Sequence, residues 1–337
     1  MVDVICLGEA LIDIFAPVGM SLKEAEIFRR APGGAPANVA AALAKLCVSV
    51  GFIGKVGEDP FGHLLAETLA GVGVDISLMR FEPEARTTLA WVAQPDVNRS
   101  EFIFYRHPGA DMLLRADEID ADYVTQARIF HYGSISLIAD PSRTATFYAL
   151  EVAKEAGALI SYDPNWRPFL WRGLDHARQG ILEGLTYADL VKVNETELEF
   201  MTGHADIDAG SQWLLERDVR LVVVTRGPEG SYFNDGRAKG FVTAFRVDTV
   251  DATGCGDGFV AGLLASLLER GYDLEGLTGP DLRAILQFAN AVGALTATRK
   301  GVIPALPTRE AVRAFLAANT PGADRQPGGG RGAHHRE

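Results

Sequence analysis

The sequence lacks most features of disulfide-rich, membrane or nucleic-acid-binding proteins. Its three cysteines, Cys6, Cys47 and Cys255, lie far apart without a C-x-x-C pair, so we expect no disulfide framework and no zinc site. No run of about 18 apolar residues indicates a membrane span, and no basic segment followed by an apolar signal opens the chain. A net charge of −12 without a basic block argues against nucleic-acid binding. We therefore expect a soluble cytoplasmic protein that acts without membrane or nucleic acid.

Several familiar active-site motifs are also missing. The chain has no G-x-x-x-x-G-K-[ST] phosphate loop, no G-x-G-x-x-G after its first strand, no H-R-D or D-F-G motif and no G-x-S-x-G elbow. Its seven histidines show no metal-site spacing. If the protein uses ATP, it must hold the phosphates with a different loop.

Short apolar runs alternate with helical patterns along most of the chain, which predicts an α/β fold. Repeated strand–helix units favour a parallel sheet with helices on both faces. Polar residues follow the strands and would gather at one sheet edge, where ligands bind in such folds. Expected strands cover residues 2–7, 10–15, 51–56, 129–132, 159–162, 190–193 and 221–225, and expected helices cover 39–46, 60–69, 141–156, 172–186, 259–268, 281–298 and 308–318.

Two segments fit a smaller sheet outside this main layer. Residues 85–94 and 102–105 are rich in β-forming residues without helical periodicity, and 12–15 and 27–28 resemble them. We expect residues of about 12–30 and 85–110 to form this unit within a single domain spanning 1–320. The segment 321–337, with three consecutive glycines and few apolar residues, is predicted to be a disordered tail.

The strongest signal for a site is the segment 248–259. A β-branched run leads into Gly254-Cys255-Gly256-Asp257, and the expected helix follows. A glycine-rich turn at a helix N-terminus can hold an anion with backbone N–H groups. Asp257 would lie in the first helical turn, and a base beside an anion site is what phosphoryl transfer to an alcohol requires. The alternative is that Asp257 merely caps the helix.

Five further residues, in three parts of the chain, are candidates for substrate binding. Asp13 follows the first strand, where it would bind a polar substrate or be a solvated loop acid. Gly33 and Gly34 precede a helix and let a ligand approach the backbone, with Asn38 projecting from the first turn. Arg106 ends the second β-rich segment as either a substrate clamp or a solvated hairpin charge.

These motifs together resemble the ribokinase-like sugar kinases of the PfkB family over residues 3–316. The most specific matches are residues 33–40 with 54–62, and residues 251–257; residues 104–106 with 110–114, and 130–137, resemble the plant-type fructokinases in particular. The resemblance implies a three-layer sandwich with a mostly parallel central sheet and a small β lid. It also implies an ATP-dependent fructokinase that makes D-fructose 6-phosphate and ADP. Two alternatives remain: a kinase for another sugar or sugar acid such as 2-keto-3-deoxygluconate, and a catalytically silent fructokinase-like interaction protein.

The resemblance assigns expected roles to individual residues. Asp257 would be the general base, with the amides of Gly254, Cys255 and Gly256 as the anion hole. The sugar-binding set would be Asp13, Gly33, Gly34, Asn38 and Arg106. Arg167 would meet phosphate charge, with a surface salt bridge as the alternative. Asn194 and Glu197 match the N-x-x-E motif that organises Mg²⁺ and the ATP phosphates, Glu197 acting on the metal indirectly, although helix capping explains the same pattern. Thr225, Gly227 and Gly230 would border the nucleotide, with Asn290 near the adenine.

The resemblance further implies a cation and a partner, and the chain departs from the family pattern at three central positions. Asp251 and Thr253, with residues 299–301, resemble loops that bind an activating monovalent cation, usually K⁺. The lid would close over the sugar and form a homodimer interface. Cys255 stands where the family usually has alanine, Ala252 where it has threonine, and Gly258 where it has alanine or serine. We hypothesise that helix position lowers the pKa of the Cys255 thiol and makes the enzyme sensitive to alkylation; an inert buried residue is the alternative.

Overall fold

The computed structural model describes residues 2–96 and 99–319, so the tail predicted for 321–337 lies outside the described residues. Nine strands form the main sheet in the order β13-β12-β11-β10-β9-β8-β1-β4-β5. All neighbouring pairs are parallel except those that β12 makes with β11 and β13. The strands are β1 (Val4–Leu7), β4 (Val50–Gly57), β5 (Met79–Glu82), β8 (Ile129–Tyr132), β9 (Leu159–Tyr162), β10 (Leu190–Asn194), β11 (Leu221–Thr225), β12 (Gly230–Asn234) and β13 (Lys239–Thr243).

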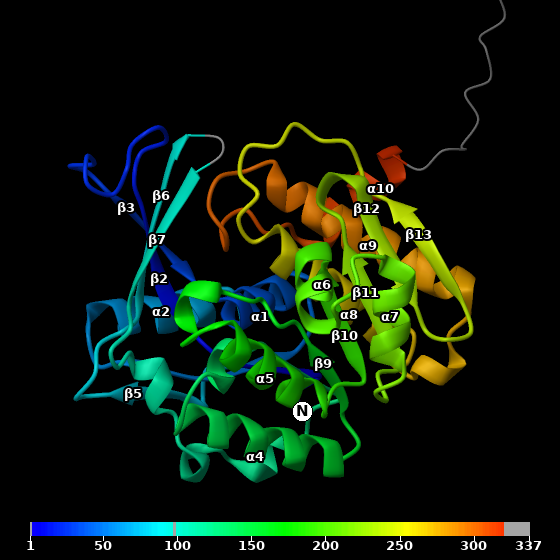
Figure 1. Cartoon of the computed structure of the whole chain (residues 1–337), viewed down its shortest axis with the longest axis horizontal. Helices are drawn as coiled ribbons and strands as arrows, with labels where there is room; N and C mark the ends of the chain where they lie inside the picture. The colour runs from blue at the N-terminus through cyan, green and yellow to red at the C-terminus, as the bar shows by residue number, and fades with distance from the viewer. Residues whose placement is uncertain (1, 97–98, 320–337) are drawn as a thin grey trace, which may run out of the picture.

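Helices cover both faces of this sheet, so the predicted three-layer α/β architecture is confirmed (Figure 1). Alternate residues of β1 belong to two separate hydrophobic cores: Val4 and Cys6 pack on one face, Ile5 and Leu7 on the other. The first face carries α1 (Ala35–Lys45), α2 (Pro60–Gly71), α8 (Cys255–Glu269), α9 (Gly279–Ala297) and α10 (Arg309–Asn319). The second carries α3 (Ala121–Val124), α4 (Ser142–Glu155), α5 (Leu174–Leu185), α6 (Glu195–Thr202) and α7 (Ile207–Leu215).

A separate four-stranded sheet stands away from the main body, at the left of Figure 1. Its order is β3 (Arg29–Gly33), β2 (Leu11–Phe15), β6 (Leu89–Asp96) and β7 (Arg99–Tyr105). These strands come from the two segments expected to form the small sheet, with β3 slightly later than the predicted piece at 27–28. On one face of this sheet, Asp13 lies in register with Ala90 of β6, and Ala90 is paired with Phe104 of β7. The small sheet therefore presents an acidic side chain on the same face as apolar neighbours.

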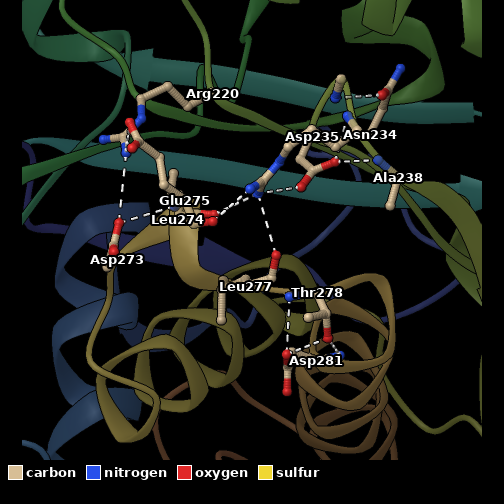
Figure 2. Close-up of polar contacts among 12 residues, drawn as sticks. Arg220, Asn234, Asp235, Ala238, Asp273, Leu274, Glu275, Leu277, Thr278 and Asp281 are labelled. Atoms are coloured by element: carbon tan, nitrogen blue, oxygen red, sulfur yellow. Dashed lines mark hydrogen bonds and ion pairs between the residues drawn. The ribbon is translucent and has the colours of Figure 1, made fainter.

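Polar contacts fasten the β12–β13 hairpin to the segment that leads into α9 (Figure 2). Arg237 donates to the carbonyl oxygens of Leu274, Glu275 and Leu277. Thr278 and Asp281 then form a capping box that starts α9. Since α9 and this hairpin both contribute residues to the cavity described below, the contacts fix two of its walls relative to each other. Within the described residues, no helix combines the length and apolar character needed to cross a membrane.

Candidate active site

The first turn of α8 forms the centre of the site. Gly254 is the residue before the helix and has φ of 78°, a left-handed conformation that glycine adopts at little cost. A β-carbon at this position would also collide with the side chain of Val302. The turn places Asp257 in the first turn of α8, as predicted, with its side chain buried.

Two amide side chains hold the Asp257 carboxylate. Asn38 Nδ2 donates to Oδ2 at 2.8 Å, and Asn165 Nδ2 donates to Oδ1 at 3.4 Å. Burial raises the pKa of Asp257 to about 6, while the Asn38 hydrogen bond opposes that rise. A carboxylate with this pKa is ionised at neutral pH and is still a stronger base than an exposed aspartate. The arrangement suits a group that accepts a proton.

Four of the five residues predicted to bind the sugar, all except Arg106, are connected to this carboxylate directly or through Asp13 and Asn38. Asp13 and Asp257 interact electrostatically, and burial raises the pKa of Asp13 to about 7. Gly33 lies directly against the Asp13 carboxylate, where any side chain would collide with it. Gly34 precedes α1 with φ of 102° and packs on the Glu9 carbonyl. Asn38 Oδ1 is buried without a hydrogen-bond partner among the described residues, so it is free to accept a hydroxyl.

Arg167 lies at the open side of this group. Its side chain is exposed and its Nη1 donates to the backbone oxygens of Asn165 and Trp166. Its charge lowers the pKa of both Asp13 and Asp257. Among the residues with described positions it forms no salt bridge, so the surface ion pair that was the alternative is absent there.

Arg106 lies at the base of the small sheet rather than in solvent. It is buried, its Nε donates to Asp111 Oδ2 at 2.8 Å, and its Nη2 donates to the Ile135 carbonyl at 3.3 Å. The alternative interpretation of Arg106 as a solvated hairpin charge is therefore wrong. Within residues 2–96 and 99–319, Arg106 makes no hydrogen bond or ion pair with Asp13, Asn38 or Asp257, and its role as a sugar clamp stays a prediction.

A cavity of about 630 Å³ opens beside the first turn of α8. It is lined by residues from β11, β12, α9 and the α8 N-terminus. These include the four positions predicted to border the nucleotide and two of the anion-hole residues: Thr225, Gly227, Gly230 and Asn290, together with Cys255 and Gly256. Asn290 donates to the Val242 carbonyl at 3.1 Å. Four of the six predicted ATP-binding residues and two of the three predicted anion-hole residues thus share one cavity.

Asn194 and Glu197 form a capping box at the start of α6. Glu197 N donates to Asn194 Oδ1 at 2.8 Å, and Asn194 N donates to Glu197 Oε2 at 2.9 Å. The second Glu197 oxygen accepts from Trp166 N. Neither residue lines the cavity above. Because backbone N–H groups already occupy both Glu197 oxygens, the residue fits an indirect contact with a metal through water better than direct ligation.

The two stretches proposed for a monovalent cation meet in the structure. Asp251 Oδ1 accepts from both Thr253 N and Thr253 Oγ1, and Asp251 Oδ2 accepts from Gly301 N at 3.1 Å. The amides of Val250 and Asp251 also donate to the Ala297 carbonyl. Asp251 therefore ties together the loop before α8 and the loop after α9.

The expectation of a lowered pKa at Cys255 is wrong. Its thiol points back to the Asp251 carbonyl at 3.9 Å and is partly buried. Burial, followed by the negative charges of Asp251 and Asp257, raises its pKa to about 11. These effects outweigh the helix position, so the thiol is protonated at neutral pH.

Three residues of this site were not identified from the sequence as site residues. Asn165 contacts Asp257, and Glu9 accepts the Ala35 N–H under the Gly34 turn. Lys192 lies in β10, and its Nζ is 2.9 Å from Asp163 Oδ2. A lysine between two valines in a buried strand was a signal available in the sequence.

Comparison with known proteins gives consistent matches over nearly the whole chain. The family described as pfkB family carbohydrate kinase matches residues 1–309. A probable chloroplastic fructokinase-6 of Arabidopsis thaliana is 49% identical over 318 residues, covering 93% of this chain and 82% of that protein. The crystal structure of a Xylella fastidiosa fructokinase with bound ATP has a TM-score of 0.84 and 34% identity, covering 94% and 98% of the two chains. A double mutant of Vibrio cholerae fructokinase with fructose, ADP and potassium has a TM-score of 0.83, with the same identity and coverage.

Proposed function

Because the chain belongs to the pfkB family of carbohydrate kinases, we propose that it is an ATP-dependent fructokinase. It transfers the γ-phosphoryl group of ATP to the primary hydroxyl of D-fructose and releases D-fructose 6-phosphate and ADP. The observation that carries this proposal is the buried Asp257 carboxylate, fixed by Asn38 beside a cavity that includes the first turn of α8. Relatives named fructokinase, and a related enzyme crystallised with fructose and ADP, support the choice of sugar.

The residues of the site then have separate roles in sugar binding and phosphoryl transfer. Asp257 accepts the proton of the sugar hydroxyl as that oxygen attacks the phosphorus atom. The amides of Gly254, Cys255 and Gly256 stabilise the charge on the transferring group. The exposed Arg167 guanidinium attracts the negatively charged phosphates. The sugar is held by Asp13, Gly33, Gly34 and Asn38, with Arg106 as a further sugar ligand from the base of the lid.

ATP enters as its magnesium complex, in which Mg²⁺ neutralises part of the phosphate charge. Glu197, set by Asn194, would orient water around that metal rather than bind it directly. We further propose that K⁺ binds near Asp251 and Thr253, because Asp251 joins the two loops that border the anion hole. The bound potassium in the Vibrio cholerae enzyme supports this choice of cation.

The small sheet is proposed to act as a lid and as a dimer interface. Asp13 lies on one of its faces and belongs to the site, so closure of this face over the sugar would exclude water and limit ATP hydrolysis. Ile103 and Tyr105 on β7 are 50% and 64% exposed. Covering them with a second copy of the chain would remove apolar surface from water. A cytoplasmic location fits three cysteines without a disulfide.

Two other functions weighed at the outset are less well supported. A silent interaction protein would not need Asp257, its anion hole and an adjoining cavity together. A kinase for 2-keto-3-deoxygluconate shares the scaffold, but the related proteins compared above are named as fructokinases.

The test is a coupled ADP-release assay with MgATP and K⁺ against fructose, glucose, ribose, adenosine and 2-keto-3-deoxygluconate. We expect a clear preference for fructose and a lower rate when Na⁺ replaces K⁺. Preferred turnover of another sugar would reject fructose as the substrate. No ADP release with any acceptor would reject the assignment of the protein as a kinase. Equal rates in K⁺ and Na⁺ would reject only the cation site.

A further inference from the structure

Lys192 is a charged residue in the interior of the main sheet. It lies in β10 between Val191 and Val193, both fully buried, and is itself 7% exposed. A buried ammonium loses its hydration and destabilises a fold unless other groups compensate for that loss. An apolar residue here would extend the core without this penalty. The sheet alone therefore does not explain the lysine.

Among the described residues, one carboxylate compensates for this loss by a direct hydrogen bond. Lys192 Nζ lies 2.9 Å from Asp163 Oδ2, and both side chains are buried. In the described part of the chain, Asp163 is the hydrogen-bond acceptor that Nζ contacts. An ammonium has three N–H donors, so the pair leaves two donors for another acceptor. Nearby negative charges raise the pKa of Lys192 against the effect of burial, which keeps the group charged.

The free donors lie at the anion hole. A methyl group placed on Gly256 would be 3.4 Å from Lys192 Nζ, so the ammonium lies against the first turn of α8. Glu197 and Asp257 also interact with its charge. Positive charge beside a helix N-terminus is unfavourable in the free protein, because the N–H groups there already carry partial positive charge. An anion bound between the amides and the ammonium would be attracted by both.

We propose that Lys192 is a catalytic residue that donates hydrogen bonds to the oxygens of the phosphoryl group during its transfer. The inference rests on the proposed kinase function and deepens it. The bond between the γ-phosphorus and the bridging oxygen of ADP breaks as the bond to the sugar oxygen forms. The hydroxyl proton goes to Asp257, ADP leaves with the bridging electrons, and Lys192 keeps its proton. Its charge stabilises negative charge on the equatorial oxygens.

The rival explanation is that Lys192 only neutralises Asp163, which in turn accepts the Asn165 N–H near the base. A double-mutant cycle separates the two roles. The variants are Lys192→Met, Asp163→Asn and both together, each checked for folding by circular dichroism and thermal unfolding. The double variant removes both buried charges, so it remains informative if Lys192→Met alone fails to fold. If Lys192 contacts the phosphoryl group, the lysine change lowers kcat about 10²- to 10³-fold both in the wild-type background and in the Asp163→Asn background.

The second measurement is the affinity for a mimic of the transferring group. Dissociation constants for ADP alone, and for ADP with fluoroaluminate and the acceptor sugar, are measured by calorimetry. We expect Lys192→Met to weaken the fluoroaluminate complex by a factor similar to its loss of kcat, with ADP and fructose affinities within about threefold of wild type. Lys192→Arg should restore part of the loss because it keeps the charge.

Lys55 provides a matched control, since it is 5% exposed and paired with Glu82 and Glu118 outside the site. Lys55→Met should leave the fluoroaluminate affinity of the folded protein unchanged. The proposal is overturned if the loss in kcat disappears in the Asp163→Asn background, or if fluoroaluminate affinity survives Lys192→Met. Wild-type turnover of fructose separately tests the kinase function. If another sugar is preferred, kcat and the fluoroaluminate affinity of each variant are compared with wild type using that sugar.

Discussion

Replacing Asn38 by alanine should move the acid limb of the pH profile of kcat/KM to higher pH. Asn38 Nδ2 donates to Asp257 Oδ2 at 2.8 Å, and this hydrogen bond opposes the effect of burial, so that the pKa of the carboxyl is about 6 with the bond in place. The bond favours the ionised form, which is the form that can accept the sugar proton. Without it, Asp257 stays protonated to higher pH, and the enzyme loses activity on the acid side.

The size of the shift follows from the bond. A hydrogen bond to a charged group contributes about 1.5–3 kcal/mol, and about 1.4 kcal/mol corresponds to one pH unit. The pKa of Asp257 should therefore rise from about 6 to about 7–8 in the variant. At pH 7 the ionised fraction would fall from about nine-tenths to between about one-tenth and one-half. The other charged groups that influence Asp257, namely Asp13, Asp163, Arg167 and Lys192, remain unchanged.

The assay is the initial rate at low fructose and saturating MgATP from pH 5 to pH 9, scaled to each variant's plateau. Scaling matters because Asn38 Oδ1 is free to hold the sugar, so the plateau itself should fall. Asn165→Ala is the matched control: its amide lies 3.4 Å from the same carboxylate, and this longer contact should give a smaller shift. A lower plateau with an unmoved acid limb would refute the argument and leave Asn38 as a sugar ligand only.

Three further changes test other parts of the site. Gly254→Ala imposes a β-carbon at φ of 78° against Val302, and should lower the free energy of urea unfolding by about 1–2 kcal/mol as well as kcat; unchanged values for both would show that the turn tolerates a side chain. Arg106→Met leaves Asp111 buried without its cation, so unfolding free energy should fall by about 3–5 kcal/mol and recover in part with Asp111→Asn added, whereas a loss below about 1 kcal/mol would mean that the pair does not anchor the lid base. Iodoacetamide at pH 7.5 should inactivate wild type and Cys255→Ala at equal rates, because a pKa of about 11 leaves little thiolate; faster loss in wild type would restore a reactive Cys255.

The sequence predicts those parts of the fold where one local signal dominates. Strands 129–132, 159–162 and 221–225 have the same bounds in the structure because each is a short apolar run between polar segments. Strands β12 and β13 were not predicted. They pair as an antiparallel hairpin at the sheet edge, and their sequences mix glycine, polar and aromatic residues without a clear period. Helix α6 was not among the predicted elements either, although helix capping was the stated alternative for the Asn194 and Glu197 pattern, and both residues do cap this helix.

The site residues, like the elements of the fold, were predicted correctly where the signal is local in the sequence. Asp257 was placed correctly in the first helical turn because glycines and a helix pattern are local features. The contacts of Asn165 and Lys192 depend on residues that lie 92 and 29 positions away, so a single sequence gives no means of pairing them. The pKa of Cys255 was predicted in the wrong direction for a related reason: the helix terminus is visible in the sequence, but the burial that raises the pKa most is not.

The most direct test of the account is the turnover of Asp257→Asn with fructose and MgATP. The change keeps the shape of the side chain and removes the base, so kcat should fall about 10²- to 10⁴-fold while the dissociation constant for fructose and the thermal unfolding midpoint stay close to wild type. Turnover near the wild-type value in this folded variant would contradict the account, since proton transfer to Asp257 would then not be part of the reaction.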